Sequence, residues 1–463
     1  MTDSHFLRRL KLPVSADEAF AWHERPGAFE RLAPPWDVVE VVERHGSIHP
    51  GDRIVVRLWI AGLPIHWVAE HHGCEPGRQF CDRELAGPFA VWEHVHRFLP
   101  QGERCVLEDD ITFRLPGGPL GSLLGGGHAR RTLERMFAYR HRVTQDDMQA
   151  HAKYAGQPPQ SVAITGATGL VGSQLVPFLT TGGHRAISLT RSKSSSRAPT
   201  AGETAAWDPS TGEISAAGPL DAVIHLAGES IAAGRWNARR KQAIRDSRVG
   251  PTRRLSEQLA RLTVKPRVLI CASAIGYYGD RGDKTLTEQS PAGSGFLPEV
   301  CREWEEATRP AAEAGIRVVN LRLGVILSPK GGALSSMLGP FSFGLGGVIG
   351  SGRQYWSWIA LDDVIGAIHH AIFADNLSGP VNVTAPTPVT NREFTKTLGQ
   401  VLRRPTIFPL PAFAARIILG EMADELLLAS ARVMPAKLTK TGYSFRFSQL
   451  EAALRHVLGQ NQK

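Results

Sequence analysis

Three regularly spaced glycines are the first residues whose types point to a chemistry. Gly166, Gly169 and Gly172 follow the apolar run Val162–Ile164, and an apolar helical pattern begins at Leu170. Such glycines allow a tight turn and let the backbone approach a pyrophosphate, which the free N–H groups of the helix then bind. The segment predicts a dinucleotide-binding loop. Its expected cofactor contacts are Gly166, Thr168, Gly169, Leu170, Val171 and Gly172.

The end of the next predicted strand bears on which dinucleotide is bound. Ala186–Thr190 has the pattern of a buried strand and is followed by Arg191 and Ser192, where an NAD-binding unit would carry an acidic residue. A guanidinium group matches phosphate oxygens at two points, whereas a carboxylate would repel them. These residues favour NADP(H) over NAD(H). The alternative is that Arg191 is a solvated loop charge.

The elements that position this loop belong to an alternating series. Further buried strands are predicted at the four segments Asp221–Leu226, Arg267–Ala272, Arg317–Leu323 and Val381–Val383, with helical patterns between them. Strands that alternate with helices indicate an α/β fold with a doubly wound parallel sheet, the Rossmann arrangement. We expect this domain to span residues 161–400.

Residues 1–150 have a different pattern. A capped amphipathic helix is predicted over Ser15–Phe29 and a long helix over Gly126–Arg142, and the polar segment 149–160 marks the boundary to the next domain. Between the two helices, short alternating runs predict an antiparallel sheet. These runs are Val38–Arg44, Arg53–Ile60, Ile65–His71, Gln79–Leu85, Ala90–Leu99 and Cys105–Leu115. This order resembles the α+β helix-grip fold of START-like, polyketide-cyclase-like (SRPBCC) proteins, which implies a pocket for an apolar small molecule.

Histidines are frequent in this first domain. His94 and His96 are two residues apart and therefore share one face of a predicted strand. A metal or acid–base site is conceivable there. Because no carboxylate or thiol spacing completes a ligand set, we expect these histidines to be structural and predict no metal site.

Length and composition fit a globular protein of several domains. The chain has 463 residues, of which 42% are hydrophobic, and no apolar run long enough to span a membrane. Five cysteines without CxxC spacing, and an N-terminus without an apolar signal core, fit a reducing, cytoplasmic location. The net charge of +9 is spread along the chain without a dense basic block, so nucleic-acid binding is not expected.

Five motifs after residue 161 carry a family resemblance: TGATGLVG, DAVIHLAGESI, RVLICASAIGYYGD, RVVNLRLGVILSPKGGAL and WSWIALDDVIGAI. In this order the segment resembles the extended short-chain dehydrogenases/reductases of the NAD(P)-dependent epimerase family. AGESI, SAIGYYG, VCREWE and GLGGVIGSGRQYWSWI are similar to one subgroup, which also ends in a small helical module without assigned function, here residues 405–460. The resemblance implies further NADP contacts at Thr190, Leu226, Ala227, Gly228, Arg248 and Val325. Arg248 could equally be a solvated helix charge.

The resemblance also defines a catalytic position. In the family, a serine polarises the substrate oxygen, and a tyrosine supported by a lysine four residues later moves the proton. Ser273 occupies the serine position. On the helix predicted over Phe296–Ala307, Leu297 and Cys301 stand where the tyrosine and lysine belong, and neither can replace them.

Three explanations for this difference remain open. Tyr277 or Tyr278 could supply a phenol, or Glu229 or Asp280 could act as a carboxylate base. Alternatively, the domain binds NADP(H) without ordinary epimerase chemistry. The resulting hypothesis is an NADP(H)-dependent protein that acts on a small carbonyl or hydroxyl substrate, with a homodimer considered as its assembly. Its alternative is a non-catalytic NADP-binding sensor or scaffold whose first domain binds or transfers an apolar molecule.

Two remaining segments carry weaker predictions. The glycine-rich segment Gly331–Gly352 and the aromatic residues in and after it could form a mobile apolar lid, or could pack into the core. Those aromatic residues are Phe341, Phe343, Trp356 and Trp358. Asp362 and Asp363 start a predicted helix, and we expect one of them to be its N-cap rather than a catalytic group. Arg322 is expected in a pocket floor or a structural ion pair.

Overall fold

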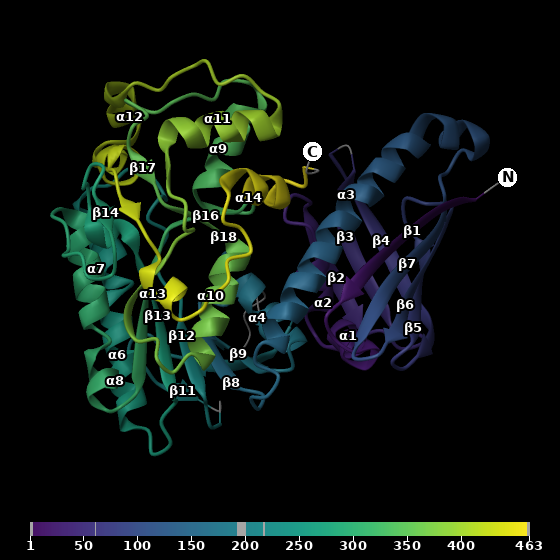
Figure 1. The fold of residues 1–463 in the computed structure, drawn as a ribbon, viewed down its shortest axis with the longest axis horizontal. Coiled ribbons are helices and arrows are strands. Elements are labelled where there is room, and N and C mark those ends of the chain that lie inside the picture. The colour runs from purple at the N-terminus through teal and green to yellow at the C-terminus, as the bar shows by residue number, and fades with distance from the viewer. Residues whose placement is uncertain (1–2, 61, 192–200, 216–217, 461–463) are drawn as a thin grey trace.

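A computed structural model describes residues 3–60, 62–191, 201–215 and 218–460. Figure 1 shows two halves side by side, one built on an antiparallel sheet and one on a mostly parallel sheet. The first half comprises Ser4–Ala152, and the second half begins at Ser161. Within the described residues, no helix combines the length and apolar character needed to cross a bilayer.

The first half is a seven-stranded antiparallel sheet packed against a long helix, in the order β1-β7-β6-β5-β4-β3-β2. Its strands are β1 (Ser4–Leu12), β2 (Val39–His45), β3 (Arg53–Ile60), β4 (Leu63–Glu75), β5 (Gln79–Ala86), β6 (Val91–Gln101) and β7 (Arg104–Arg114). Alternation of buried and exposed residues explains the sheet, as in β6, where Trp92, His94, His96 and Phe98 face inward. The sequence prediction did not include β1, which pairs with β7 along its whole length.

Three helices accompany this sheet. The expected first helix is α1 (Ala16–Glu24), capped by the Ser15 side chain, and a separate short helix, α2 (Ala28–Leu32), follows it. The long helix α3 (Gly118–Ala152) is longer than predicted at both ends. Two apolar clusters fill the space between α3 and the sheet, one around Phe20 and Phe98 and the other around Trp92 and Phe137.

The second half is a doubly wound sheet in the order β11-β10-β9-β8-β12-β13-β15-β19. Its strands are β8 (Ser161–Thr165), β9 (Arg185–Thr190), β10 (Glu203–Trp207), β11 (Ile214–Ser215), β12 (Ala222–His225), β13 (Val268–Ala274), β15 (Arg317–Leu323) and β19 (Gly379–Val383). All neighbouring pairs are parallel except β10 with β11. From β8 the chain forms β9, β10 and β11 on one side of that strand and then crosses to β12 on its other side. Folds of this type bind nucleotides where the strand order reverses, which here is at the carboxyl ends of β8 and β12.

Helices and short strands complete the second half. The helices are α4 (Gly172–Thr181), α5 (Ala238–Asp246), α6 (Val249–Arg261), η1 (Ile275–Tyr278), α7 (Phe296–Glu306), α8 (Arg309–Glu313), α9 (Gly332–Ser342), α10 (Leu361–Phe373) and α11 (Asn391–Leu402). The short strands are β14 (Thr285–Leu286), β16 (Val325–Leu327), β17 (Tyr355–Trp356), β18 (Trp358–Ala360) and β20 (Val389–Thr390). The main core contains α4, α10 and the central strands, whose side chains are almost fully buried.

The C-terminal segment returns over the second half and reaches the first. It contains α12 (Ala412–Leu419), a π-helical turn η2 (Ala423–Leu428), β21 (Arg432–Val433), α13 (Ala436–Lys440) and α14 (Leu450–Val457). Strand β21 pairs with β14, and α14 packs against α11. In Figure 1, α14 lies between the two halves.

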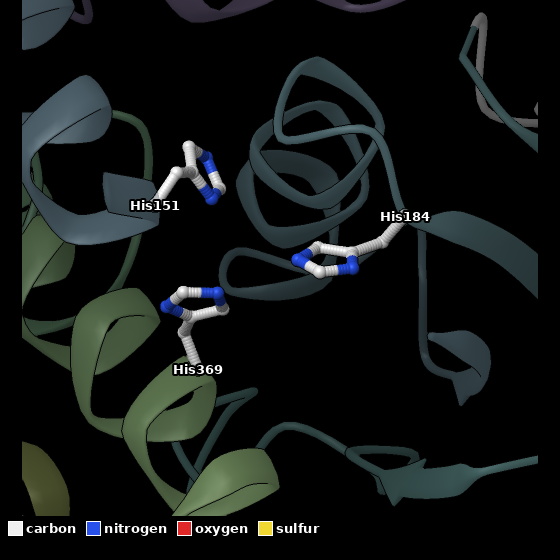
Figure 2. Close-up of side chains that lie close together, drawn as sticks. All are labelled: His151, His184 and His369. Carbon is white, nitrogen blue, oxygen red and sulfur yellow. The ribbon is translucent and has the colours of Figure 1, made fainter. Parts of the chain in front are cut away.

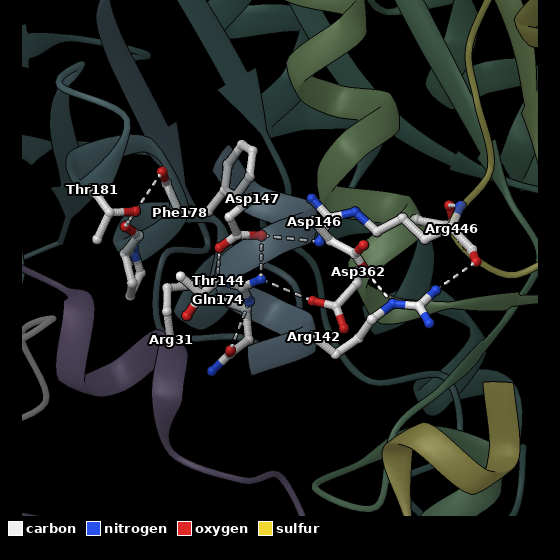
Figure 3. A network of polar contacts seen from close by, with 12 residues as sticks. Arg31, Arg142, Thr144, Asp146, Asp147, Gln174, Phe178, Thr181, Asp362 and Arg446 are labelled. Carbon is white, nitrogen blue, oxygen red and sulfur yellow. Dashed lines mark hydrogen bonds and ion pairs between the residues drawn. The ribbon is translucent and has the colours of Figure 1, made fainter. Parts of the chain in front are cut away.

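A buried charge network joins all three parts (Figure 3). Arg31 of α2 donates two hydrogen bonds to Asp147 of α3, at 2.7 and 2.8 Å, and one to Asp362 of α10 at 3.0 Å. Arg446 of the C-terminal segment donates to Asp147 at 2.9 Å. Asp147 is fully buried and Arg31 is 1% exposed, so the charges neutralise one another in the absence of water.

This network corrects one sequence prediction. Neither Asp362 nor Asp363 is the N-cap of α10, because the helix begins at Leu361 and its N-cap is Ala360. Asp362 binds Arg31, and Asp363 accepts hydrogen bonds from the backbone N–H groups of Arg446 and Phe447. The two carboxylates therefore anchor other segments to α10.

Candidate functional site

The glycine loop lies between β8 and α4 and is packed too closely for side chains. Gly166 has φ +70°, and a Cβ there would stand 2.8 Å from the backbone of Leu226. At Gly172 a Cβ would stand 2.3 Å from the Gly166 carbonyl oxygen. The Gly169 N–H donates to that same oxygen at 2.9 Å, which closes the turn. The loop brings backbone N–H groups to the start of α4, as a pyrophosphate site requires.

The ends of β9 and β12 flank this loop. Arg191 is exposed directly after β9, and Thr190 is half-buried at the end of that strand. Ser192 lies outside the described residues. After β12, the backbone N–H groups of Leu226 and Ala227 donate to Thr165 Oγ1 at 3.2 and 3.3 Å. These contacts hold the β8 and β12 ends together at the sheet edge.

Arg248 lies at this edge as well. Its guanidinium group donates to the carbonyl oxygens of Glu229 at 2.8 Å and Ile244 at 3.0 Å, and it stands 5.1 Å from the centre of the Trp304 ring. A Cβ on Gly228 would be only 3.4 Å from that guanidinium. Burial lowers the pKa of Arg248. The side chain is therefore fixed beside the end of β12 and is not a solvated helix charge.

Ser273 belongs to a polar chain at the end of β13. Its hydroxyl donates to Glu305 Oε1 of α7 at 2.7 Å, and Ser273 is 2% exposed. Arg322 of β15 donates to both carboxylate oxygens of Glu305, each at 2.8 Å. The pairing of Arg322 confirms the expected structural ion pair. Glu305 is thus held in one orientation against Ser273.

The two candidate tyrosines have different surroundings. The Tyr278 side chain is fully buried; its hydroxyl lies 2.6 Å from Asn382 Oδ1, to which it donates, and accepts from Arg322 at 3.0 Å. Burial raises its pKa. Tyr277 is half-buried, and the Arg322 guanidinium stacks 3.4 Å from its ring centre. The contacts of Tyr278 are those of a structural residue, so Tyr277 remains as the candidate phenol.

Leu297 and Cys301 face the same region from α7. Both are buried, and a Cβ on Gly276 would lie 3.2 Å from Leu297 Cβ. Burial raises the pKa of the Cys301 thiol to about 12. At neutral pH this group is therefore a neutral thiol, which supplies neither the cation nor the proton transfer of a tyrosine–lysine pair.

Three of the four aromatic residues in and after the glycine-rich segment pack into the core. Phe341, Trp356 and Trp358 are 6% exposed or less, and Phe343 is 83% exposed. Val325, the first residue of β16, donates its N–H to the Ser357 carbonyl oxygen at 2.8 Å, which places it directly after the carboxyl end of β15. Of the four predicted lid aromatics, only Phe343 is exposed.

Comparisons with known proteins agree with this arrangement. Residues 162–383 match the NAD dependent epimerase/dehydratase family, residues 12–138 match polyketide cyclase / dehydrase and lipid transport proteins, and residues 410–457 match a domain of unknown function (DUF1731). The epimerase family protein Mb2239 of Mycobacterium bovis is 46% identical over 298 residues, covering 64% of this chain and 97% of the relative. The human epimerase family protein SDR39U1 is 33% identical, covering 64% of this chain and 99% of the relative.

Two solved structures extend the likeness. The nucleoside-diphosphate sugar epimerase of Corynebacterium glutamicum has a TM-score of 0.80 at 36% identity, with 99% of this chain and 91% of that chain covered. Human SDR39U1 (isoform 2), solved with NADPH, has a TM-score of 0.59 at 32% identity, with 64% of this chain and 98% of that chain covered. Fold and site thus define a nicotinamide-dinucleotide-binding protein with a helix-grip domain in front. The chain belongs to the NAD dependent epimerase/dehydratase family, in the group of SDR39U1-type proteins.

Sequence reasoning missed the part that Glu305 plays. Glu305 served only to align α7 with the family pattern, although it is the direct partner of Ser273. Its spacing of four residues from Cys301 gave a signal, because it places both residues on one face of the helix. Its partner, Ser273, lies on β13, against which α7 packs. A single sequence does not reveal that these two elements are neighbours.

Proposed function

We propose that this protein binds NADP(H) in preference to NAD(H) and transfers a hydride to or from a small carbonyl or hydroxyl substrate beside Ser273. The observation that carries the cofactor choice is the exposed Arg191 at the carboxyl end of β9, next to the glycine loop. A guanidinium there suits a 2′-phosphate. The NADPH in the structure of the human relative supports the same choice.

The proposed proton path uses Ser273 and Glu305. When bound, the nicotinamide supplies or accepts the hydride. The Ser273 hydroxyl donates to Glu305. A substrate hydroxyl would pass its proton to the Ser273 oxygen while the Ser273 proton passes to the carboxylate. In the reverse direction the same pair delivers a proton to a carbonyl oxygen. Arg322 holds Glu305 in this orientation. Ser273 and Glu305 together then transfer the proton that a tyrosine supported by a lysine transfers in the family.

The cofactor proposal is tested by calorimetric titration of the full chain with NADPH and NADH. Arg191→Asp should weaken NADPH binding much more than NADH binding, because the substituted carboxylate repels only the 2′-phosphate. Arg104→Asp, the same change at an exposed position of the first half, is the control and should leave both affinities unchanged. Equal losses for the two cofactors in Arg191→Asp would refute the phosphate role.

The catalytic proposal is tested by following NADPH oxidation with a panel of carbonyl compounds. Ser273→Ala should abolish turnover and retain NADPH affinity, and Glu305→Gln should reduce turnover strongly, since an amide does not accept the proton. Loss of turnover in Tyr277→Phe with full activity in Glu305→Gln would show instead that the Tyr277 phenol transfers the proton. Tight NADPH binding without turnover on any substrate would favour the alternative, a non-catalytic sensor or scaffold.

A further inference from the structure

A second polar centre lies inside the first half, remote from the nucleotide loop. It consists of Asp82 on β5, His94 and His96 on β6, Asp109 on β7 and His141 on α3. The sheet register places Asp82 opposite His94 and Asp109 opposite His96. The group stands among the two apolar clusters that fill the space under α3.

Three of these side chains have the spacing of metal ligands. Asp82 Oδ2 lies 3.2 Å from His94 Nδ1 and 3.7 Å from His96 Nε2, and the two imidazole centres are 3.8 Å apart. Ligand bonds to zinc of about 2.0–2.2 Å in tetrahedral geometry separate two ligand atoms by about 3.4 Å. The two distances lie on either side of that value. The set of two histidines and one carboxylate is a known type of site for divalent transition metals.

Each of the three proposed ligand side chains also contacts a second residue on the side away from the metal position. His94 Nε2 lies 3.1 Å and His96 Nδ1 lies 2.7 Å from Asp109 Oδ1, and His141 Nε2 binds the other oxygen of Asp109 at 2.6 Å. Trp92 Nε1 donates to Asp82 Oδ1 at 3.1 Å. A carboxylate that takes the far N–H of a ligating histidine directs the lone pair of the other nitrogen at the metal. Asp109 Oδ1 makes this hydrogen bond with His94 Nε2 and lies beside His96 Nδ1.

We propose that Asp82, His94 and His96 bind one divalent transition metal ion of the Zn²⁺ type. Asp82 and Asp109 together supply two negative charges, which balance the ion in a buried setting. Three protein ligands leave a coordination position for a water molecule or for an oxygen atom of a bound molecule.

Two other groups of histidine, cysteine or acidic side chains among the described residues could hold a metal ion and are the rival sites. His151, His184 and His369 approach one another at the junction of the two halves (Figure 2). There His184 Nδ1 accepts a hydrogen bond from the Gln160 N–H at 3.1 Å, so the neutral ring carries its proton on Nε2, and the group includes no carboxylate. The other rival, His72 with Cys81 and Glu93, contains a thiol whose pKa is raised by burial.

The proposal is tested on the full chain after treatment with a chelator. Calorimetric titration with ZnCl₂ and the visible spectrum with CoCl₂ should show one bound ion per chain. His96→Gln and Asp82→Asn should each weaken Zn²⁺ binding by more than about tenfold, and Asp109→Asn by about 10- to 100-fold. His151→Phe, which removes a ligand from the rival group, is the matched control and should retain full affinity.

X-ray absorption at the zinc edge decides the question on the wild-type chain, whether or not a variant folds. Two imidazoles with oxygen ligands at about 2.0–2.2 Å would support the proposal. Three imidazoles without a carboxylate would assign the ion to the His151 group, and sulfur at about 2.3 Å would assign it to Cys81. Either result, or a wild-type chain that binds neither Zn²⁺ nor Co²⁺, would overturn the proposal.

Discussion

Two groups of buried and half-buried histidines in this protein are stabilised in opposite ways. In the first half, His94 stands between Asp82 and Asp109; burial lowers its pKa, but the two carboxylates outweigh burial and raise the pKa to about 9. At the junction of the halves, His151, His184 and His369 pack against one another and against aromatic rings. Burial lowers the pKa of all three, for His184 to about 4.

The difference shows that the neighbours of an imidazole, not burial alone, determine its charge. His151 stacks on Phe178 with ring centres 4.3 Å apart, and neither of its nitrogens has a hydrogen-bond partner among the described residues. This junction uses the histidines as neutral aromatic rings. The Asp82–Asp109 region uses the same side chain as a charged or ligating group. Four substitutions or conditions test this contrast, from the largest expected effect to the smallest.

Asp109→Asn should have the largest effect. The amide removes the charge that faces His94, His96 and His141, and breaking a buried ion pair costs about 3–5 kcal/mol of unfolding free energy. Denaturant unfolding of the first half, followed by tryptophan fluorescence, measures the loss. Asp110→Asn on the outer face of the same strand is the control. A loss below about 1 kcal/mol in Asp109→Asn would show that the carboxylate is not needed for stability.

Mild acid should weaken the junction. The folded pKa values of His151, His184 and His369 lie below the unfolded value of about 6.5, so the unfolded chain binds more protons and stability falls as pH drops from 6.5 toward 4. At pH 5 a single such histidine costs about 2 kcal/mol. Thermal melting between pH 7.5 and 5 measures this dependence, and His369→Phe should make it shallower. A profile unchanged by that substitution would contradict the neutral state of His369.

His151→Phe should be almost neutral at pH 7.5. Phenylalanine fills the same space beside Phe178 and removes two nitrogens without partners, so the change in unfolding free energy should stay within about 1 kcal/mol. His94→Phe, the equivalent change in the other group, should cost at least about 3 kcal/mol because it breaks the buried ion pairs of His94 with Asp82 and Asp109. Similar losses of unfolding free energy for the two variants, measured by denaturant unfolding, would contradict the proposed difference between the two histidine groups.

Arg9→Ala should have the smallest effect. Arg9 is 64% exposed and binds Glu108, the residue next to Asp109 that faces the other side of β7. Exposed ion pairs contribute about 0–1 kcal/mol and weaken with salt. Unfolding in low and high salt should therefore show a small loss that disappears as salt increases. A loss as large as that of Asp109→Asn would show that the outer face of the sheet is as important as the inner one.

Several features of the fold could be read from local patterns. Alternation of apolar and polar residues located the strands of the first half from β2 to β7, because a sheet with one buried face imposes a period of two. The glycine loop and the strand before it indicated the nucleotide-binding edge, because close backbone approach excludes a Cβ. The first strand, β1, was missed, since basic residues interrupt its apolar pattern and its pairing with β7 cannot be read from local sequence.

The candidate sites depended more on contacts between distant segments. Ser273 was identified from its motif, but its partner Glu305 is 32 residues away and meets it only when α7 packs beside β13. Either Asp362 or Asp363 was expected to cap a helix, and Asp362 instead pairs with Arg31, which is 331 residues away. Side-chain partners of this kind depend on packing, which leaves little trace in a single sequence.

The sequence by itself determined most of the order of elements, the glycine loop and the cation at the end of β9, because each follows from residue type and local spacing. The missing tyrosine–lysine pair followed from the family resemblance. The tertiary structure decided which charges meet. His94 and His96 could be placed on one strand face from their spacing, yet Asp82 and Asp109 come from two neighbouring strands and reach them through the sheet register. Whether buried histidines are charged, neutral or ligating is a property of those neighbours, and only the folded chain brings them together.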